Sequence, residues 1–155
     1  MSADDNKALI RRLFAAHCRQ DVEAAVACFS PDAVNHDRRV GREGMEQVYR
    51  AHYTTFPDYH WEEKLLVAEG PWVTALVLVS GTHLGIPERR ILADIAPDTE
   101  PTGKRWEALH AHFYRIEDGL IVEHEAVRDD WGVVKQLGLQ LPTSNRDRGA
   151  GQAAH

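Results

Sequence analysis

The strongest constraint on the fold is an alternation of side-chain types between positions 104 and 128. The segment "KRWEALHAHFYRI" has this pattern, and "LIVEHEAVR" follows it after Glu117-Asp118-Gly119. A period of two is typical of β-strands whose two faces have different surroundings, and Asp-Gly is typical of a tight hairpin turn. We therefore predict two long antiparallel strands over 104–116 and 120–128.

The same alternation predicts which side chains share a face of each strand. One face of the first strand is rich in aromatic and imidazole rings: Trp106, Ala108, His110, His112 and Tyr114. The face of the second strand that carries a histidine comprises Val122, His124, Ala126 and Arg128. If both faces point inward, three histidines lie close together.

The first third of the chain has a helical period instead. Apolar positions predict a helix over 4–20, a second short helix from Asp21 to Phe29, ended by Ser30-Pro31-Asp32, and a third over 42–56. Two further strands are predicted on either side of a turn at Gly70-Pro71, followed by a long connection over 86–103 and a short helix over 131–138. Long connections in compact domains are often functional lids.

Helices followed by a meander of strands indicate an α+β domain. We predict one domain over 1–140, in which a curved antiparallel sheet wraps around three N-terminal helices and encloses one cavity, and a polar, disordered tail over 141–155. The net charge of −6 argues against a nucleic-acid partner. No apolar run is long enough to span a bilayer, and two cysteines are too few for a disulfide framework, so we expect a cytoplasmic protein with no membrane partner.

Four segments together resemble one known family. They are "PDAVNHDRRVGREGMEQVYRAHYTTFPD", "GPWVTALVLVSGTHLG", "PTGKRW" and "FYRIEDGLIVEHEAVRDDWGVVKQLG". From about Asn6 to about Gly138 the chain resembles the SnoaL-like polyketide cyclases, or ester cyclases, which share the cone-shaped α+β fold of nuclear transport factor 2. The resemblance implies ring closure by an intramolecular aldol reaction without a cofactor.

The resemblance also implies site residues. The family's strand histidine falls on His124, its second pocket histidine on His112, and its catalytic acid on Ala126, which cannot transfer a proton. The ending "EAVRDD" is similar to a branch that includes hydroxylases and would supply the acid from Asp129 or Asp130. We predict His112 and Asp129 as the catalytic pair, with Asp130 as the cap of the last helix.

Other polar and aromatic side chains are predicted to hold the substrate, although each has an ordinary structural alternative in the core or in a turn. They are His36, Arg42, Tyr53, Trp61, Trp106, His110, Tyr114, His124 and Arg128. A metal bound by His110, His112 and His124 is the less favoured reading, because alternation leaves no carboxylate on their face. We therefore predict no metal and no cofactor.

These features predict an enzyme of secondary (antibiotic) metabolism. It would act on a hydrophobic, oxygenated ring compound by general acid/base chemistry, with cyclisation, epoxide opening or hydroxylation left open. The alternative is a non-catalytic protein that binds a small hydrophobic or aromatic molecule on the same fold. The apolar row of Leu109, Ala111 and Phe113 on the outer face predicts a homo-oligomer, either a dimer or a tetramer.

Overall fold

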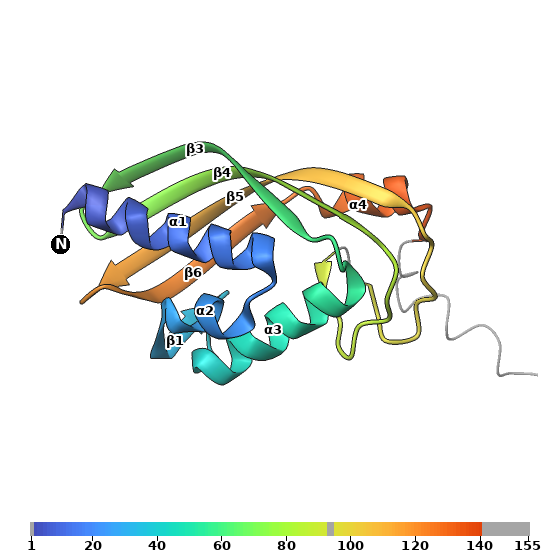
Figure 1. The fold of residues 1–155 in the computed structure, drawn as a ribbon, viewed down its shortest axis with the longest axis horizontal. Helices are drawn as coiled ribbons and strands as arrows, with labels where there is room; N and C mark the ends of the chain where they lie inside the picture. Colours follow the sequence, from blue (N-terminus) through green and yellow to red (C-terminus); the bar gives the residue numbers. More distant parts are fainter. Residues whose placement is uncertain (1, 93–94, 141–155) are drawn as a thin grey trace, which may run out of the picture.

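The computed structural model describes residues 2–92 and 95–140 and has helices followed by long strands (Figure 1). The elements, in chain order, are α1 (Ala3–Arg19), α2 (Val22–Ala27), β1 (Phe29–Asn35), β2 (Arg38–Arg39), α3 (Gly41–Thr55), β3 (His60–Glu69), β4 (Trp72–Thr82), β5 (Arg105–Glu117), β6 (Leu120–Arg128) and α4 (Asp130–Leu137). The predicted tail from 141 onward lies outside the described residues. Among the described helices, none is long and apolar enough to cross a membrane.

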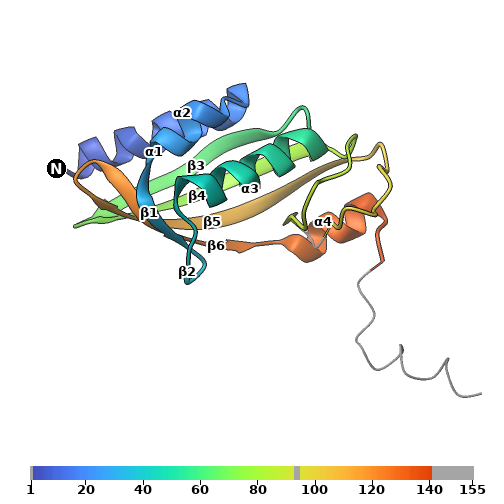
Figure 2. The same ribbon diagram turned by 90° about the horizontal axis from the view of Figure 1, so that it is seen from below.

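The six strands form one curved sheet in the order β2-β1-β6-β5-β4-β3. Helices α1, α2 and α3 lie along one face of this sheet (Figures 1 and 2). The predicted α+β class is therefore confirmed. The sheet is mixed rather than wholly antiparallel, because β1 pairs parallel to β6, and in this respect the prediction is wrong.

Strand β1 replaces the predicted end of the second helix. Phe29 is not helical but begins β1, where it pairs with Ile121 of β6. The pairing is irregular between Phe29 and Val34, around Pro31, which has no N–H to donate. At the far end Asn35 pairs with His124, and His36 follows in a turn with a φ of 49°. This short parallel strand therefore brings Asn35 and His36 beside the histidines of the long strands.

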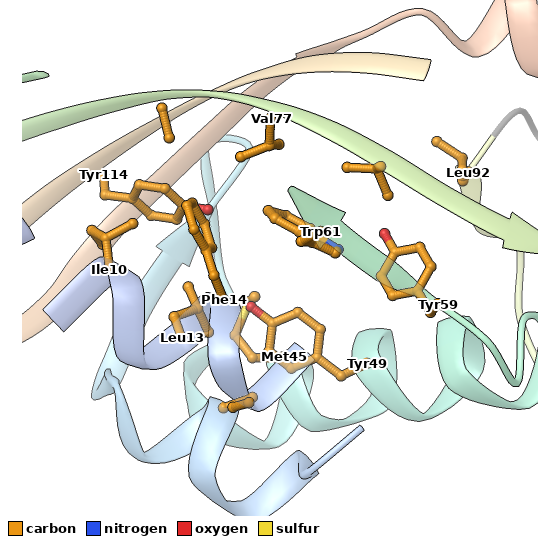
Figure 3. Close-up of a cluster of buried hydrophobic side chains, with 14 of the residues drawn as sticks. Ile10, Leu13, Phe14, Met45, Tyr49, Tyr59, Trp61, Val77, Leu92 and Tyr114 are labelled. Atoms are coloured by element: carbon orange, nitrogen blue, oxygen red, sulfur yellow. The ribbon is translucent and has the colours of Figure 1, made fainter. Parts of the chain in front are cut away.

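The core fills the space between the helices and the sheet (Figure 3). Ser2 and Asp5 form a reciprocal cap at the start of α1. The predicted inner face of this helix is confirmed, since its members are all buried: Leu9, Ile10, Leu13, Phe14 and His17. Three of them, Ile10, Leu13 and Phe14, lie below Tyr114 and Trp61 of the sheet (Figure 3).

Strand β5 follows the predicted alternation, whereas on β6 the alternation breaks at the register shift, where Ile121 is buried and Val122 only half-buried. All five residues of the ring-rich face of β5, from Trp106 to Tyr114, are buried. The turn between β5 and β6 has positive φ at both central residues, 48° at Asp118 and 77° at Gly119, as the tight hairpin requires.

The predicted long connection lies between β4 and β5. The N–H groups of Leu84 and Gly85 donate to the Thr55 carbonyl at the end of α3, at 3.0 and 3.1 Å. A side chain at Gly85 would overlap the Thr54 carbonyl, so only glycine allows this close approach. The connection is thereby held across the open end of the sheet, where it can contribute to a cavity.

Candidate active site

A cavity of about 210 Å³ lies between α3, the long strands and the β4–β5 connection. Its walls carry the rings of Tyr49, Tyr59, Trp61 and Tyr114. Tyr49 comes from α3 and Trp61 from β3 (Figure 3), and the ring of the buried His17 lies against both, at centroid distances of 4.7 and 4.5 Å. This volume is below the roughly 300–1,000 Å³ of most ligand pockets, so a small ring body fits best.

Seven of the predicted site residues line this cavity. They are His36, Trp61, His110, His112, Tyr114, His124 and Arg128. Five of the seven come from β5 and β6, where alternation was sufficient to place them on one wall: His110, His112, Tyr114, His124 and Arg128.

Three predicted substrate-binding residues lie elsewhere. Arg42 is exposed at the start of α3, and its Nε–H donates to the Phe29 carbonyl at 2.7 Å. The Tyr53 hydroxyl is hydrogen-bonded to Nδ1 of the buried His17 at 2.6 Å. Trp106 is buried with its ring edge-on to Phe56, at a centroid distance of 5.1 Å. None of the three lines the cavity, so the structure does not support their predicted contact with substrate.

Asp129 also lies outside the cavity. Its carboxylate accepts a hydrogen bond from the Gly132 N–H at 2.8 Å and so caps α4. The cap is Asp129 and not Asp130, so that assignment was wrong; Asp130 instead lies 3.4 Å from Arg128. Because Asp129 is exposed and already bonded, its position does not support the predicted role of catalytic acid.

The cavity wall contains a chain of three hydrogen-bonded side chains. Nδ1 of His124 lies 2.8 Å from Oδ1 of Asn35, and Nε2 of His124 lies 2.9 Å from Nδ1 of His112. An amide oxygen only accepts, so Nδ1 of His124 carries its proton and Nε2 is a bare acceptor. His112 must then donate from Nδ1, which leaves its Nε2 unprotonated. That atom is buried and has no partner within the described residues.

Burial keeps these imidazoles neutral. Desolvation lowers the pKa of His112 well below its usual value, and the neighbouring His124 lowers it further. Desolvation likewise lowers the pKa of His110 to about 3 and that of His124 to about 3. At neutral pH the wall therefore presents uncharged rings, and the lone pair on Nε2 of His112 is available to accept a proton.

The structure adds His52 to the site. Its Nδ1–H donates to the Val48 carbonyl at 2.7 Å, and desolvation lowers its pKa to about 4. The helical spacing of Met45, Val48, Tyr49 and His52 already placed this side chain on the inner face of α3, so the sequence contained the signal. The β4–β5 connection also lines the cavity, but its sequence has no helical or strand period that could have indicated this. The residues concerned are Arg89, Arg90, Ile91 and Leu92.

The charged groups around the cavity are unevenly distributed. Three arginines line it, and no aspartate or glutamate does so among the residues that the structure describes. An acidic side chain lies at the rim, where Glu125 is 3.0 Å from Nδ1 of the exposed His36. Within the described ranges, no group of three histidine, cysteine or acidic side chains is arranged to hold a metal ion.

The family follows from a comparison with known proteins. A family model for SnoaL-like polyketide cyclases matches residues 7–137. The chain belongs to the SnoaL-like polyketide cyclase family. This confirms the resemblance inferred from the sequence.

Relatives within this family have names that specify a reaction. Nogalonic acid methyl ester cyclase of Streptomyces nogalater is 29% identical over 114 residues, which cover 73% of this chain and 78% of the relative. Aklanonic acid methyl ester cyclase DnrD of Streptomyces peucetius is 33% identical over 116 residues, 74% of each chain.

Solved structures of similar proteins have the same fold. TsrD of Streptomyces laurentii matches with a TM-score of 0.78 and 25% identity, covering 90% of this chain and 99% of that chain. AclR of Streptomyces galilaeus, provisionally assigned as a hydroxylase, matches with a TM-score of 0.71 and 28% identity, covering 88% of this chain and 98% of that chain. The family members together support a role in polyketide cyclisation or hydroxylation.

Proposed function

We propose that this SnoaL-like protein is an acid/base enzyme that isomerises a small oxygenated ring compound, with His112 as the proton acceptor. The observation that carries the proposal is the Asn35–His124–His112 chain, which ends at an Nε2 that has no hydrogen-bond partner among the described residues. A base must be both correctly protonated and within reach of its substrate, and His112 is one of the residues that line the cavity.

The reaction that best fits the names of the relatives is an intramolecular aldol closure. Nε2 of His112 takes a proton from a carbon next to a carbonyl group, and the electron pair moves to the carbonyl oxygen to give an enolate. The enolate carbon then bonds to a second carbonyl carbon of the same molecule. The oxygen of that carbonyl receives the proton from His112, so the product is an isomer of the substrate and no electrons are transferred.

The remaining cavity residues have roles that follow from their chemistry. The guanidinium group of Arg128, which lines the cavity, would stabilise the negative oxygen of the enolate. Trp61, whose ring centroid lies 4.7 Å from that of His112, would contact a flat ring body. The step needs no carboxylate, which accounts for a site in which Ala126 stands where the resemblance places an acid.

The competing proposal is a binding protein without catalytic activity, and Ala126 is the observation that favours it. Both proposals are tested by incubating the protein with nogalonic acid methyl ester and aklanonic acid methyl ester, the compounds in the relatives' names. We expect an isomer of equal mass and altered retention on chromatography. A product one oxygen atom heavier would indicate hydroxylation, and binding without any product would favour the binding protein.

Asn35 is predicted to position the base through His124. Asn35→Leu removes the acceptor that fixes the tautomer of His124, so we expect kcat to fall about 10-fold or more while KM changes little. Asn35→Asp keeps the acceptor and adds a negative charge, which raises the pKa of His124. This variant should keep most of the activity and shift the acidic limb of the pH–rate profile upward. Full kcat in Asn35→Leu would remove the histidine chain from the mechanism.

We also propose that two copies of the chain pair through the outer face of the sheet. Apolar side chains form a row across four strands through the pairings Leu65–Leu76, Leu76–Ala111 and Ala111–Val127. Helices α1 to α3 all lie on the other face (Figure 2). Val127 of this row is 69% exposed, and Leu109, two residues before Ala111 on the same face of β5, is 50% exposed. Such exposure is unusual for an apolar surface that has no partner.

This assembly predicts a dimer mass in light scattering at micromolar concentration. The double substitution Leu109→Glu with Val127→Glu places charges in the row and should give a monomer. Arg19→Gln, a change on α1 far from this face, should leave the dimer intact. A monomer mass for the unmodified protein would refute the pairing.

A further inference from the structure

We infer that the substrate carries a carboxylate, which arginines at the cavity mouth hold while the ring body lies among the aromatic side chains. The inference rests on the proposed function, because it names the class of compound that the same cavity takes. It also sets this chain apart from the relatives, whose names specify methyl esters.

The first argument is the contrast between the whole chain and its cavity. The chain has a net charge of −6, with 24 acidic and 18 basic residues. The cavity reverses this balance: its described walls carry Arg89, Arg90 and Arg128 and no acidic side chain. Arginine is suited to this task, because its planar donors match the two oxygens of a carboxylate.

The second argument is that two of these cations, Arg89 and Arg128, form no tight ion pair with a carboxylate of the described residues. Arg128 lies 3.4 Å from Asp130, which is long compared with the roughly 2.7–2.9 Å of a strong charged hydrogen bond. Its side chain is 32% exposed, so it borders both the cavity and the solvent. Arg89 is exposed and has no ion-pair partner among the described residues. An incoming carboxylate would therefore find donors that need not first break a tight pair.

The third argument comes from the shape of the site. Beside the inner cavity is an outer hollow, which shares Asn35, His36, Val48 and Arg89 with it. Trp61, Tyr59 and Leu92 line only the inner space, whereas Arg38 and Glu43 line only the outer one. An amphipathic compound with one or two fused rings fits this arrangement, with its rings inward and its anionic group beside Arg89. Glu43 would repel an anion that lies further out and so restricts where the carboxylate is held.

An anionic substrate would also strengthen the base. Burial is the largest cause of the low pKa of His110, His112, His124 and His52; the positive charge of Arg128 lowers each pKa further, and for His52 so does that of Arg89. A bound carboxylate offsets these charges and raises the pKa of the histidines. His112 would then accept a proton more readily when the correct substrate is present than in the empty cavity.

The test compares two bicyclic probes that differ in charge but hardly in shape, 2-naphthoate and 2-naphthamide. Binding is followed by calorimetry and by quenching of tryptophan fluorescence, because Trp61 lines the cavity. We expect 2-naphthoate to bind at least about 10-fold more tightly at low salt, with the difference shrinking at high salt. Arg89→Gln and Arg128→Gln should each weaken naphthoate several-fold and leave naphthamide unchanged. Arg19→Gln, which changes an exposed arginine on α1, should have no effect on either probe.

The inference would be overturned if both probes bound with equal affinity or if neither bound. It would also be overturned if Arg19→Gln weakened the binding of naphthoate as much as Arg89→Gln and Arg128→Gln do. The outcomes also separate it from the proposed function. A preference for naphthoate without turnover of any ring substrate would leave the inference standing and refute the enzyme. Isomerisation of the methyl esters with no preference for naphthoate would support the enzyme and refute the carboxylate.

Discussion

Replacing His112 with phenylalanine is expected to lower kcat by about 100-fold or more, because the only proposed proton acceptor is removed. Phenylalanine keeps a flat ring of similar size, which can still stack on His124, whose ring lies nearly parallel at a centroid distance of 5.2 Å. Substrate binding should therefore survive, and KM should change much less than kcat. The measurement is steady-state turnover of the compound that the native protein isomerises.

Asp129→Asn is the matched control for this experiment. It alters the residue that the sequence suggested as catalytic, but the amide oxygen can still cap α4 through the Gly132 N–H. We expect turnover within about twofold of the native value and little change in stability. If Asp129→Asn abolished turnover while His112→Phe did not, the acid would lie at the strand end and the histidine mechanism would be wrong.

Acidification is expected to unfold the protein steeply below about pH 6.5. Five of the described histidines are almost completely buried, and among these five burial lowers the pKa most in His17, His52, His110 and His112. Between pH 6.5 and about 4 the unfolded chain binds protons that the folded chain does not, so the free energy of unfolding falls as the pH falls. Each of these four histidines contributes up to about 1.4 kcal/mol per pH unit, or about 6 kcal/mol per pH unit together.

Denaturant titrations at a series of pH values measure this slope directly. Above pH 6.5 these histidines are neutral in both the folded and the unfolded chain, so they should contribute nothing to the change in the free energy of unfolding with pH. His17→Phe supplies a control outside the cavity lining, and it should reduce the slope by about one histidine's share. A free energy of unfolding that stays constant between pH 7 and pH 5 would contradict the burial of these rings as neutral groups.

The long strands and helices could be predicted because burial on one side leaves a period in the sequence. Burial on the β5 face from Trp106 to Tyr114 repeats every two residues, and on α1 it follows the helical spacing from Leu9 to His17. Gly70 and Gly119 indicated where the two hairpins turn. In each of these cases local sequence and tertiary environment impose the same pattern.

Strands β1 and β2 could not be predicted in this way. Residues 29–39 contain Pro31, and the segment has only a short parallel pairing with β6 that is irregular around that proline. Parallel partners lie far apart in the sequence, so no local turn marks their register. The apolar spacing that continues from α2 to Phe29 suggested more helix, whereas the contact with Ile121 determines the strand.

The site was predictable where it lies on regular strands. Alternation was enough to place His110, His112 and His124 on the cavity side. It could not reveal the chain that ends at Asn35, because that contact depends on the unexpected strand β1. Nor could it show that Asp129 faces Gly132, since the strand ends there and the alternation with it.

The most direct test of the proposed base is the protonation state of the two linked imidazoles. Nitrogen-15 NMR of histidine-labelled protein at pH 7 distinguishes Nδ1–H from Nε2–H tautomers and from the imidazolium ion. We expect His112 and His124 to be neutral, each with its proton on Nδ1, so that Nε2 of His112 is free to accept a proton in the cavity. A proton on Nε2 of His112, in either the neutral or the charged ring, would contradict this account.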